Sequence, residues 1–173
     1  MKTHKVLISK TRIQSRVKQM ARKISSDYRG KELVLVGVLR GSFVFMADLL
    51  REISIPVEVD FIAVASYGNS TRTGGVVRLN QDLSSTITGR HVILVEDIVD
   101  SGLTLSYLLN NLKTRRPASI DVCTLLDKKD RRRARVPVKY KGFNIPDKFV
   151  VGYGLDYKQE NRQLPYIAVL EET

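Results

Sequence analysis

Several features that would point to particular classes of protein are missing from the sequence. Its only cysteine, Cys123, cannot form an intramolecular disulfide, and it lies in an apolar run that favours a buried structural thiol over a nucleophile. The longest apolar runs, such as Leu33 to Leu39, are far too short to cross a bilayer. The first ten residues, MKTHKVLISK, lack the apolar core and cleavage site of a secretory signal. We therefore expect a cytoplasmic protein that does not bind membranes.

Signals for several domains and for common nucleotide-binding loops are also missing. The chain has no internal repeat, no low-complexity segment and no Pro/Gly/Ser-rich linker. Its 173 residues suit one unit with a core of its own, so we expect a single domain spanning residues 1–173. Neither G-x-x-x-x-G-K-[ST] nor a G-x-G-x-x-G after a strand occurs, which excludes the two commonest phosphate-binding signatures.

Acidic residues are in deficit. The sequence has 18 Asp and Glu residues and 29 Lys and Arg residues, which gives a net charge of +11 and a pI near 9.9. Such a balance fits nucleic acid, an acidic membrane surface or a small polyanionic substrate as the partner. The densest basic run covers residues 128–135. Most of these charges are expected to be solvated, so charge alone does not decide the function.

Apolar residues alternate between helical spacing and short continuous runs along the chain. This alternation predicts an α/β fold with a mostly parallel sheet, in which ligands bind beyond the carboxyl ends of the strands. The loops of interest therefore follow residues 39, 64, 96 and 126. Helices are expected over residues 11–29 and 42–53 and around Leu105, Leu108, Leu109 and Leu112, and strands over residues 33–39, 57–64, 91–96, 120–126, 148–153 and 166–170.

The segment VILVEDIVDSGLTL, residues 92–105, carries the most chemical information. Glu96 and Asp97 stand together at the end of an apolar strand, where alternation would force one carboxylate toward the interior. Burying an unpaired carboxylate is costly. We therefore expect the strand to end here, with both carboxylates facing a ligand rich in hydroxyl groups or metal ions.

The turn that follows has the character of a phosphate site. Backbone N–H groups at a helix N-terminus, together with the Ser101 and Thr104 hydroxyls, form a cradle for phosphate, and Gly102 allows close approach of the backbone. Asp100, Ser101 and Thr104 can also cap the helix, because Asp and Ser are favoured N-caps. Carboxylates followed by a phosphate cradle suit a ribose 5-phosphate.

The same segment closely resembles the phosphoribosyl pyrophosphate motif of type I phosphoribosyltransferases, and specifically that of the hypoxanthine (hypoxanthine-guanine) phosphoribosyltransferases. Matching segments cover most of the chain. The resemblance implies that family's fold, a mostly parallel central sheet flanked by helices with a small hood formed by the N- and C-terminal segments. It also implies that Asp100, Ser101, Gly102, Leu103 and Thr104 bind the 5-phosphate.

Two further segments resemble loops of that family. GVLRGSFVFMADLL, residues 37–50, is similar to the pyrophosphate loop, in which Leu39, Arg40 and Gly41 bind pyrophosphate and the peptide between the first two can be cis. Read alone, it is an ordinary strand-to-helix turn. SYGNSTRTGG, residues 66–75, is similar to the flexible loop that closes over the active site, beginning with Ser66 and Tyr67.

Two more segments resemble the base-recognition segments of that family. They are LLDKKDRR, residues 125–132, and IPDKFVVGYGLDYKQENR, residues 145–162. The resemblance implies that Lys128 donates to the 6-oxo group of a purine, that Phe149 stacks on its ring and that Val150 contacts its edge through the backbone. Asp156 would lie at the purine and hold a second Mg²⁺ ion, and Arg162 would contact pyrophosphate. Taken singly, these residues also fit surface charges and a core aromatic.

The resemblance implies a purine-salvage enzyme that transfers the phosphoribosyl group of phosphoribosyl pyrophosphate to N9 of hypoxanthine, and of guanine as well. Glu96 and Asp97 would bind the ribose hydroxyls and Mg²⁺, and we take Asp100 as the candidate for proton transfer at N7. The family resemblance also implies a homodimer or homotetramer.

Three alternatives stay open. A nucleic-acid-binding regulator on the same fold would suit the basic run, although the presence of Asp100 and Lys128 argues against nucleic acid as the partner. A transferase for xanthine or guanine alone is the second alternative, and a pyrimidine transferase is the third. The segments around Lys128 and Phe149 favour a 6-oxopurine.

Overall fold

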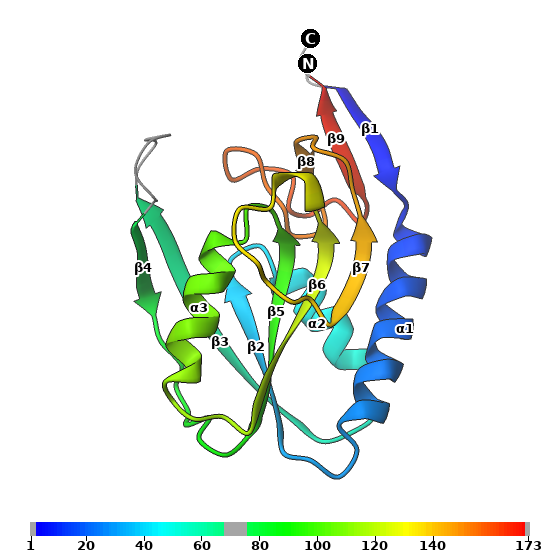
Figure 1. The fold of residues 1–173 in the computed structure, drawn as a ribbon. Helices are drawn as coiled ribbons and strands as arrows, with labels where there is room; N and C mark the ends of the chain where they lie inside the picture. Colours follow the sequence, from blue (N-terminus) through cyan, green and yellow to red (C-terminus); the bar gives the residue numbers. More distant parts are fainter. Residues whose placement is uncertain (1–2, 68–75, 172–173) are drawn as a thin grey trace.

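A six-stranded sheet lies at the centre of the computed structural model, which describes residues 3–67 and 76–171 (Figure 1). Its strands are ordered β4-β3-β2-β5-β6-β7, and every neighbouring pair is parallel except β3 and β4. The mostly parallel sheet expected from the sequence is confirmed. The strands are β2 (Leu33–Leu39), β3 (Val57–Tyr67), β4 (Val76–Gln81), β5 (His91–Val99), β6 (Ser119–Asp127) and β7 (Tyr140–Asn144).

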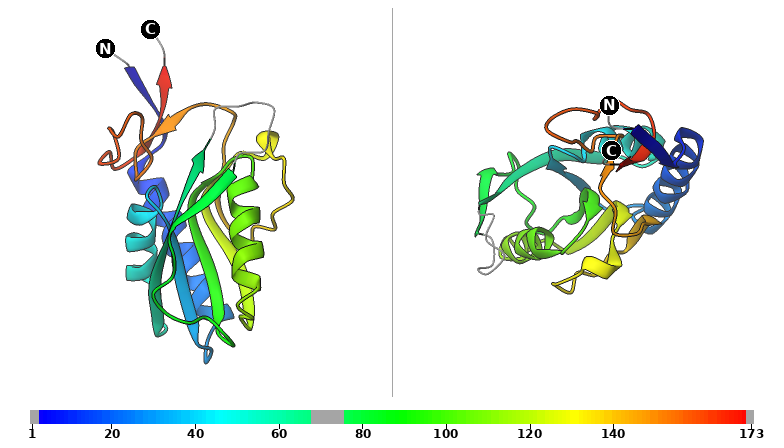
Figure 2. Two further views of the ribbon diagram at one scale, coloured as in Figure 1. Left: turned by 90° about the vertical axis from the view of Figure 1, so that its left-hand side faces the viewer. Right: turned by 90° about the horizontal axis from the view of Figure 1, so that it is seen from above.

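Helices cover both faces of this sheet (Figure 2). The helices α1 (Lys10–Asp27) and α2 (Phe43–Glu52) pack with Ile93 and Val95 of β5 in one apolar cluster. The helix α3 (Leu103–Lys113) packs with Val92 and Leu94 in the other. Successive residues of β5 therefore face opposite layers, as the strand period requires. No helix in the described part of the chain is long and apolar enough to span a membrane.

The boundaries of α1 follow from its sequence. Ile13, Val17 and Ile24 recur at helical spacing and are fully or almost fully buried. The side chain of Ser9 caps the first turn by accepting a hydrogen bond from the N–H of Arg12, at 3.4 Å. The helix ends at Asp27, and Gly30 turns the chain with a φ of +73° toward β2.

A second, three-stranded sheet stands over the carboxyl ends of the central strands (Figures 1 and 2). Its order is β1-β9-β8, so the first and last strands of the chain pair side by side. This confirms the expected hood of N- and C-terminal segments. The strands are β1 (Thr3–Ile8), β8 (Val150–Val151) and β9 (Ile167–Glu171).

Apart from β5, whose end is described with the site, two expected strands differ from the structure by more than one residue at an end. The strand predicted over residues 148–153 is only β8, because Gly152 and Tyr153 leave the extended region, with φ of +97° and +52°. The strand predicted to end at residue 64 continues through Ser66 and Tyr67, which pair with β4. Those two residues were expected to open the flexible loop, and they instead end β3. Residues 68–75 of that loop lie outside the described residues.

Three strands were missed. Neither β1 nor β4 was expected, and β7 was missed because Gly142 interrupts a short apolar pattern. A 3₁₀ turn over Lys129–Arg131 was also missed. The interpretation of Cys123 as a structural thiol is confirmed, because it is fully buried and burial raises the pKa of its thiol.

Candidate active site

The site lies where β2 and β5 separate. Their parallel pairing runs from Leu33 with His91 to Gly37 with Val95 and then stops, although both strands continue. Beyond that point β2 pairs only with β3, and β5 pairs only with β6. The helices that follow, α2 and α3, pack on opposite faces of the sheet. Such a change of side opens a crevice at the carboxyl ends of the strands, where ligands bind in α/β proteins.

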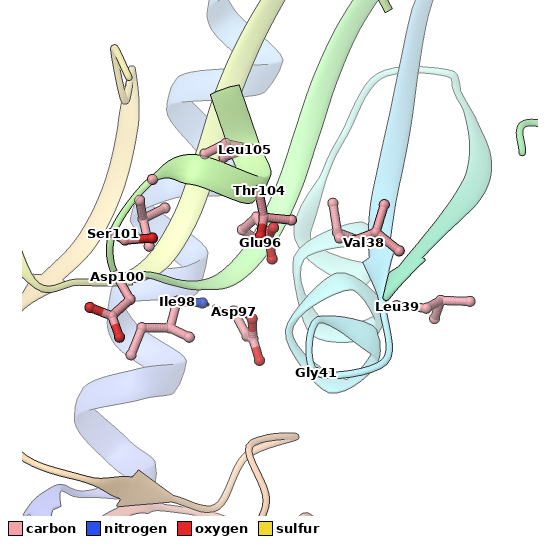
Figure 3. A pocket seen from close by; sticks show the side chains of 13 residues that line it. Val38, Leu39, Gly41, Glu96, Asp97, Ile98, Asp100, Ser101, Thr104 and Leu105 are labelled. Atoms are coloured by element: carbon pink, nitrogen blue, oxygen red, sulfur yellow. Dashed lines mark hydrogen bonds between the residues drawn. The ribbon is translucent and has the colours of Figure 1, made fainter. Parts of the chain in front are cut away.

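Two adjoining cavities, of about 230 Å³ and about 520 Å³, occupy this crevice. They share lining residues from the β2–α2 turn and from the end of β5. Residues that follow positions 39, 64, 96 and 126 all contribute to them, although the chain directly after 64 and 96 is strand and not the expected loop. The smaller cavity is lined by Val38, Leu39, Gly41, Val64, Glu96, Asp97, Ile98, Val99, Asp100, Ser101, Gly102, Thr104 and Leu105 (Figure 3).

Both carboxylates at the end of β5 border the smaller cavity, but the expected end of the strand was wrong. Pairing with β6 continues through Glu96 to Val99, so both carboxylates lie within β5. They reach the cavity because β2 no longer covers this edge. Glu96, only 8% exposed, lines this cavity together with Thr104, and Asp97 points toward Gly41 (Figure 3).

Burial and repulsion dominate the electrostatics of this pair. Burial, and then the charge of Asp97, raise the pKa of Glu96 well above its usual range. Burial also raises the pKa of Asp97, partly offset by the N–H of Ile98, which donates to Asp97 Oδ1 at 2.8 Å. Carboxylate oxygens held in this way are hard donors that suit a divalent cation or hydroxyl groups.

The β2–α2 turn packs directly on Asp97. A Cβ atom at Gly41 would lie 1.7 Å from Asp97 Oδ2, so this position accepts only glycine without displacing the carboxylate. The peptide between Leu39 and Arg40, just before it, is cis. The turn and the carboxylates are therefore one packed unit.

The turn from Asp100 to Thr104 faces the same cavity. Gly102 has a φ of +80° and precedes the first residue of α3. The N–H of Leu103 donates to Ser101 Oγ at 3.3 Å, and Leu103 itself lines neither cavity, its side chain being 41% exposed. Asp100 Oδ1 is buried and has no hydrogen-bond partner in the described residues. A buried acceptor without a partner at a cavity wall is suited to meeting a ligand.

The larger cavity combines a buried lysine with an exposed aromatic ring. Lys128 is 6% exposed, and its Nζ lies 3.8 Å from Asp147 Oδ1. Phe149, 54% exposed, is not a core residue, and its ring meets that of Tyr157 edge to face at 5.6 Å. A cavity lined by both an ammonium group and an exposed aromatic ring suits a flat heterocycle that carries a hydrogen-bond acceptor.

Two arginines that line this cavity share one hydrogen-bond partner. Gln159 Oε1 accepts from Arg40 at 3.3 Å and from Arg162 at 3.2 Å. Arg162 also pairs with Asp156 at 2.8 Å. Two guanidinium groups brought together suit an anion with several phosphate oxygens.

The sequence reasoning missed Gln159 and Arg131. Gln159 carries no local signal, because its partner Arg40 is distant in the sequence. Arg131 was treated as one of many solvated charges, yet it lines the larger cavity and donates to Asp100 Oδ2 at 3.4 Å. Its position in the dense basic run was the one available signal.

The predicted site residues gather in these two cavities, with three exceptions. Leu103 lies in the turn at the start of α3 but lines neither cavity. Ser66 and Tyr67 belong to β3. The predicted metal ligands form no joint site, because no three acidic, histidine or cysteine side chains in the described residues could hold one ion together. A magnesium ion at Glu96 and Asp97, or at Asp156, would need further oxygen ligands from a bound substrate, which is how Mg²⁺ is usually held beside phosphates.

Comparisons with known proteins agree on one family. The family model of the phosphoribosyl transferase domain matches residues 9–158. The chain is 51% identical over 172 residues to a hypoxanthine-guanine phosphoribosyltransferase of Mycobacterium avium, covering 96% of this chain and 85% of the relative. It is 49% identical over 179 residues to a hypoxanthine phosphoribosyltransferase of Haemophilus influenzae, covering 99% and 100%. The crystal structure of a hypoxanthine phosphoribosyltransferase from Staphylococcus aureus gives a TM-score of 0.93 at 43% identity, covering 96% of this chain and 91% of that one.

The raised pKa of Glu96 predicts that this residue destabilises the protein without ligand. A carboxyl group whose pKa is raised on folding costs stability once the pH exceeds its ordinary value of 4.5, and the cost grows until the raised pKa is reached. We expect Glu96→Gln to raise the melting temperature at neutral pH, by about 2–4 °C for each kcal/mol regained. This gain in melting temperature should shrink as the pH falls toward 4.5, the ordinary pKa of the carboxyl group.

Glu58→Gln is the matched control for thermal unfolding across pH. The hydrogen bond from Arg90 lowers the pKa of Glu58, so this carboxylate contributes stability at neutral pH and its loss should not raise the melting temperature. A Glu96→Gln protein that melts at or below the parent temperature at neutral pH would contradict the prediction.

Proposed function

The chain belongs to the phosphoribosyltransferase family, as a hypoxanthine(-guanine) phosphoribosyltransferase, and from this we propose a role in the reaction for the residues of the two cavities. The enzyme acts in purine salvage, joining the 5-phosphoribosyl group of phosphoribosyl pyrophosphate to hypoxanthine and releasing pyrophosphate. One observation supports these roles above all. Two adjoining cavities are lined by the β5 carboxylates, the Asp100–Thr104 turn, Lys128 and Phe149.

The smaller cavity is the proposed site of the ribose 5-phosphate. The 5-phosphate binds the turn formed by Ser101, Gly102, Leu103 and Thr104, at the N-terminus of α3. The ribose hydroxyls bind Glu96 and Asp97, which line the same cavity. Hydrogen bonds from the two hydroxyls relieve the repulsion between these carboxylates, which in the protein without ligand, together with burial, raises the pKa of Glu96.

The larger cavity is the proposed site of the base and the leaving group. Phe149 stacks on the purine, Lys128 donates to its 6-oxo group, and Val150 and Asp156 border its edge. Pyrophosphate lies at the Leu39–Gly41 turn, where Arg40 and Arg162 are held by Gln159. The base then attacks the sugar from the side opposite to the leaving pyrophosphate.

Purine N9 displaces pyrophosphate at C1 of the ribose, and positive charge develops on the sugar as the bond to pyrophosphate breaks. Asp100 accepts the proton from N7, which makes N9 more nucleophilic. The buried, unpartnered Oδ1 of Asp100 supports this role, because it is an acceptor without a donor. Arg131 holds the other oxygen of the same carboxylate.

We propose Mg²⁺ as the cofactor, with one ion held by Glu96 and Asp97 on the ribose side and a second ion held by Asp156 on the purine side. When bound, the ion neutralises charge on the pyrophosphate and so improves it as a leaving group. The all-oxygen donor set supports a hard cation over a softer transition metal. We further propose that the chain works in the cytoplasm as a homodimer or homotetramer.

The test of this assignment is a spectrophotometric assay with Mg²⁺, phosphoribosyl pyrophosphate and hypoxanthine, guanine, xanthine or adenine in separate reactions. Magnesium-dependent formation of inosine and guanosine monophosphates supports the assignment and ranks the bases. Equal rates in the presence of a chelator would remove Mg²⁺ from the proposal. No product with any base, from folded protein, would favour the nucleic-acid-binding alternative.

Asp100→Asn should keep substrate binding and lose most turnover. The amide preserves size and polarity but cannot accept the N7 proton, and general-base catalysis is typically worth about 10²- to 10⁴-fold. We expect kcat to fall within this range while KM changes little. Asp130→Asn, an exposed aspartate with no ion pair among the described residues, is the matched control. Near-normal turnover in Asp100→Asn would remove Asp100 from this role.

Gly41→Ala should weaken the handling of pyrophosphate. The new Cβ must displace either the Asp97 carboxylate or the turn itself, and misplacement by about 1 Å can cost on the order of 100-fold in rate. We expect weaker pyrophosphate binding by titration calorimetry and a matching loss of kcat/KM. Gly30→Asn, where a Cβ would meet no atom within 4 Å, is the control. Unchanged pyrophosphate affinity in Gly41→Ala would refute the assigned role of this turn.

A further inference from the structure

Asp127 is a buried carboxylate that the proposed reaction does not use. It ends β6, directly before Lys128, and is only 2% exposed. Two cations hold it: the guanidinium of Arg132 on one oxygen, and Lys141 Nζ on the other at 2.5 Å. A buried charge needs such partners, so this cluster is a fixed point of the structure.

The segment that begins at Arg132 wraps around the outside of the Asp100–Thr104 turn. The N–H groups of Arg133 and Ala134 both donate to the carbonyl oxygen of Ser101, at 2.8 and 3.1 Å. A Cβ at Gly102 would lie 3.0 Å from Arg132 Cδ and 3.0 Å from the carbonyl oxygen of Ala134. Residues 132–134 thus contact the turn through both their backbone and the Arg132 side chain.

These contacts determine how one amide of the turn is directed. The C=O of Ser101 and the N–H of Gly102 belong to the same planar peptide unit and point in opposite directions. Two hydrogen bonds on the oxygen therefore fix the direction of the N–H. The donors are the N–H groups of residues 133 and 134, outside the turn. The N–H of Gly102 therefore points away from these residues.

The wrapping segment has little regular structure of its own. Residues 132–139 belong to no helix or strand. The ion pair of Arg132 with Asp127 fixes one end of this stretch, and the buried side chain of Val136 fixes the middle. Without the ion pair, nothing among the described contacts ties the side chain of Arg132 to the sheet.

We propose that Arg132, held by Asp127, is a positioning residue for the 5-phosphate site. The pair sets the path of residues 132–134, which fix the Ser101–Gly102 peptide and so direct the Gly102 N–H toward the phosphate. This inference rests on the proposed function, because it takes the 5-phosphate to lie at that turn. Arg132 touches no substrate and acts only through the backbone of its neighbours.

The chain offers a matched pair of variants for the test. Arg132→Gln and Lys141→Gln each remove one cation from Asp127 and leave the other in place, so the carboxylate is never unpaired. Lys141 lies on β7, and no contact joins its side chain to the Ser101 turn in the described residues. A purely structural role of the cluster would affect the two variants alike.

The measurement is titration calorimetry of each protein with ribose 5-phosphate and, separately, with pyrophosphate and Mg²⁺. We expect Arg132→Gln to weaken ribose 5-phosphate binding by about tenfold, since a small misplacement of binding groups has large effects. Its pyrophosphate affinity, and both affinities of Lys141→Gln, should stay within about twofold of the parent because those sites are independent. Arg132→Lys, which keeps the charge, should recover part of the loss.

Three outcomes overturn the inference: unchanged ribose 5-phosphate binding in Arg132→Gln, an equal loss in Lys141→Gln, or an equal loss for both ligands in Arg132→Gln. Failure of the proposed function has a different signature. In that case the parent protein itself binds neither ribose 5-phosphate nor pyrophosphate, whatever the variants do. Melting temperatures measured alongside show whether a loss of binding follows a loss of folded protein.

Discussion

The separation of β2 from β5 is the constraint on which the site depends. Hydrogen bonding between the two strands stops at Gly37 and Val95, and their helices then leave to opposite faces of the sheet. The exposed edge of β5 presents Glu96 and Asp97, and the turns after each strand form two walls of one crevice. Had the pairing continued to Leu39, β2 would cover the carboxylates. The crevice is therefore a consequence of strand register, and the side chains supply its chemistry.

The carboxylates illustrate how function is built at the expense of stability. Glu96 is buried beside another acid in the middle of a strand, where an apolar residue would pack better. The surrounding structure compensates with two apolar clusters that contain the other apolar residues of β5. Glycine at position 41 brings the neighbouring turn against Asp97. Buried carboxylates within an otherwise apolar strand are typical of a binding site.

The sequence predicted the elements whose apolar pattern is long and regular, including β2 over its full length and the core of every helix. The sequence did not predict the strands whose bounds are set by backbone geometry or by contacts between distant residues. Gly152 and Tyr153 adopt positive φ and shorten β8, and β7 is held by pairing with β6 despite its glycine. At the site, family resemblance supplied Lys128 and Phe149, which lack a local signal. Gln159 could not be found, since its contact with Arg40 exists only in the folded chain.

The order of strands in the hood has a consequence for the synthesis of the chain. Strand β9, the last to be made, lies between β1 and β8 and is the only partner of each in the described sheet. The central sheet and the phosphate turn can form while the ribosome is still at work, because domains fold from the N-terminal end as they emerge. The hood has to wait for β9, so Phe149, which stands directly before β8, reaches its final place last. The proposed base site is therefore completed after the phosphate turn, in the order in which the described strands are made.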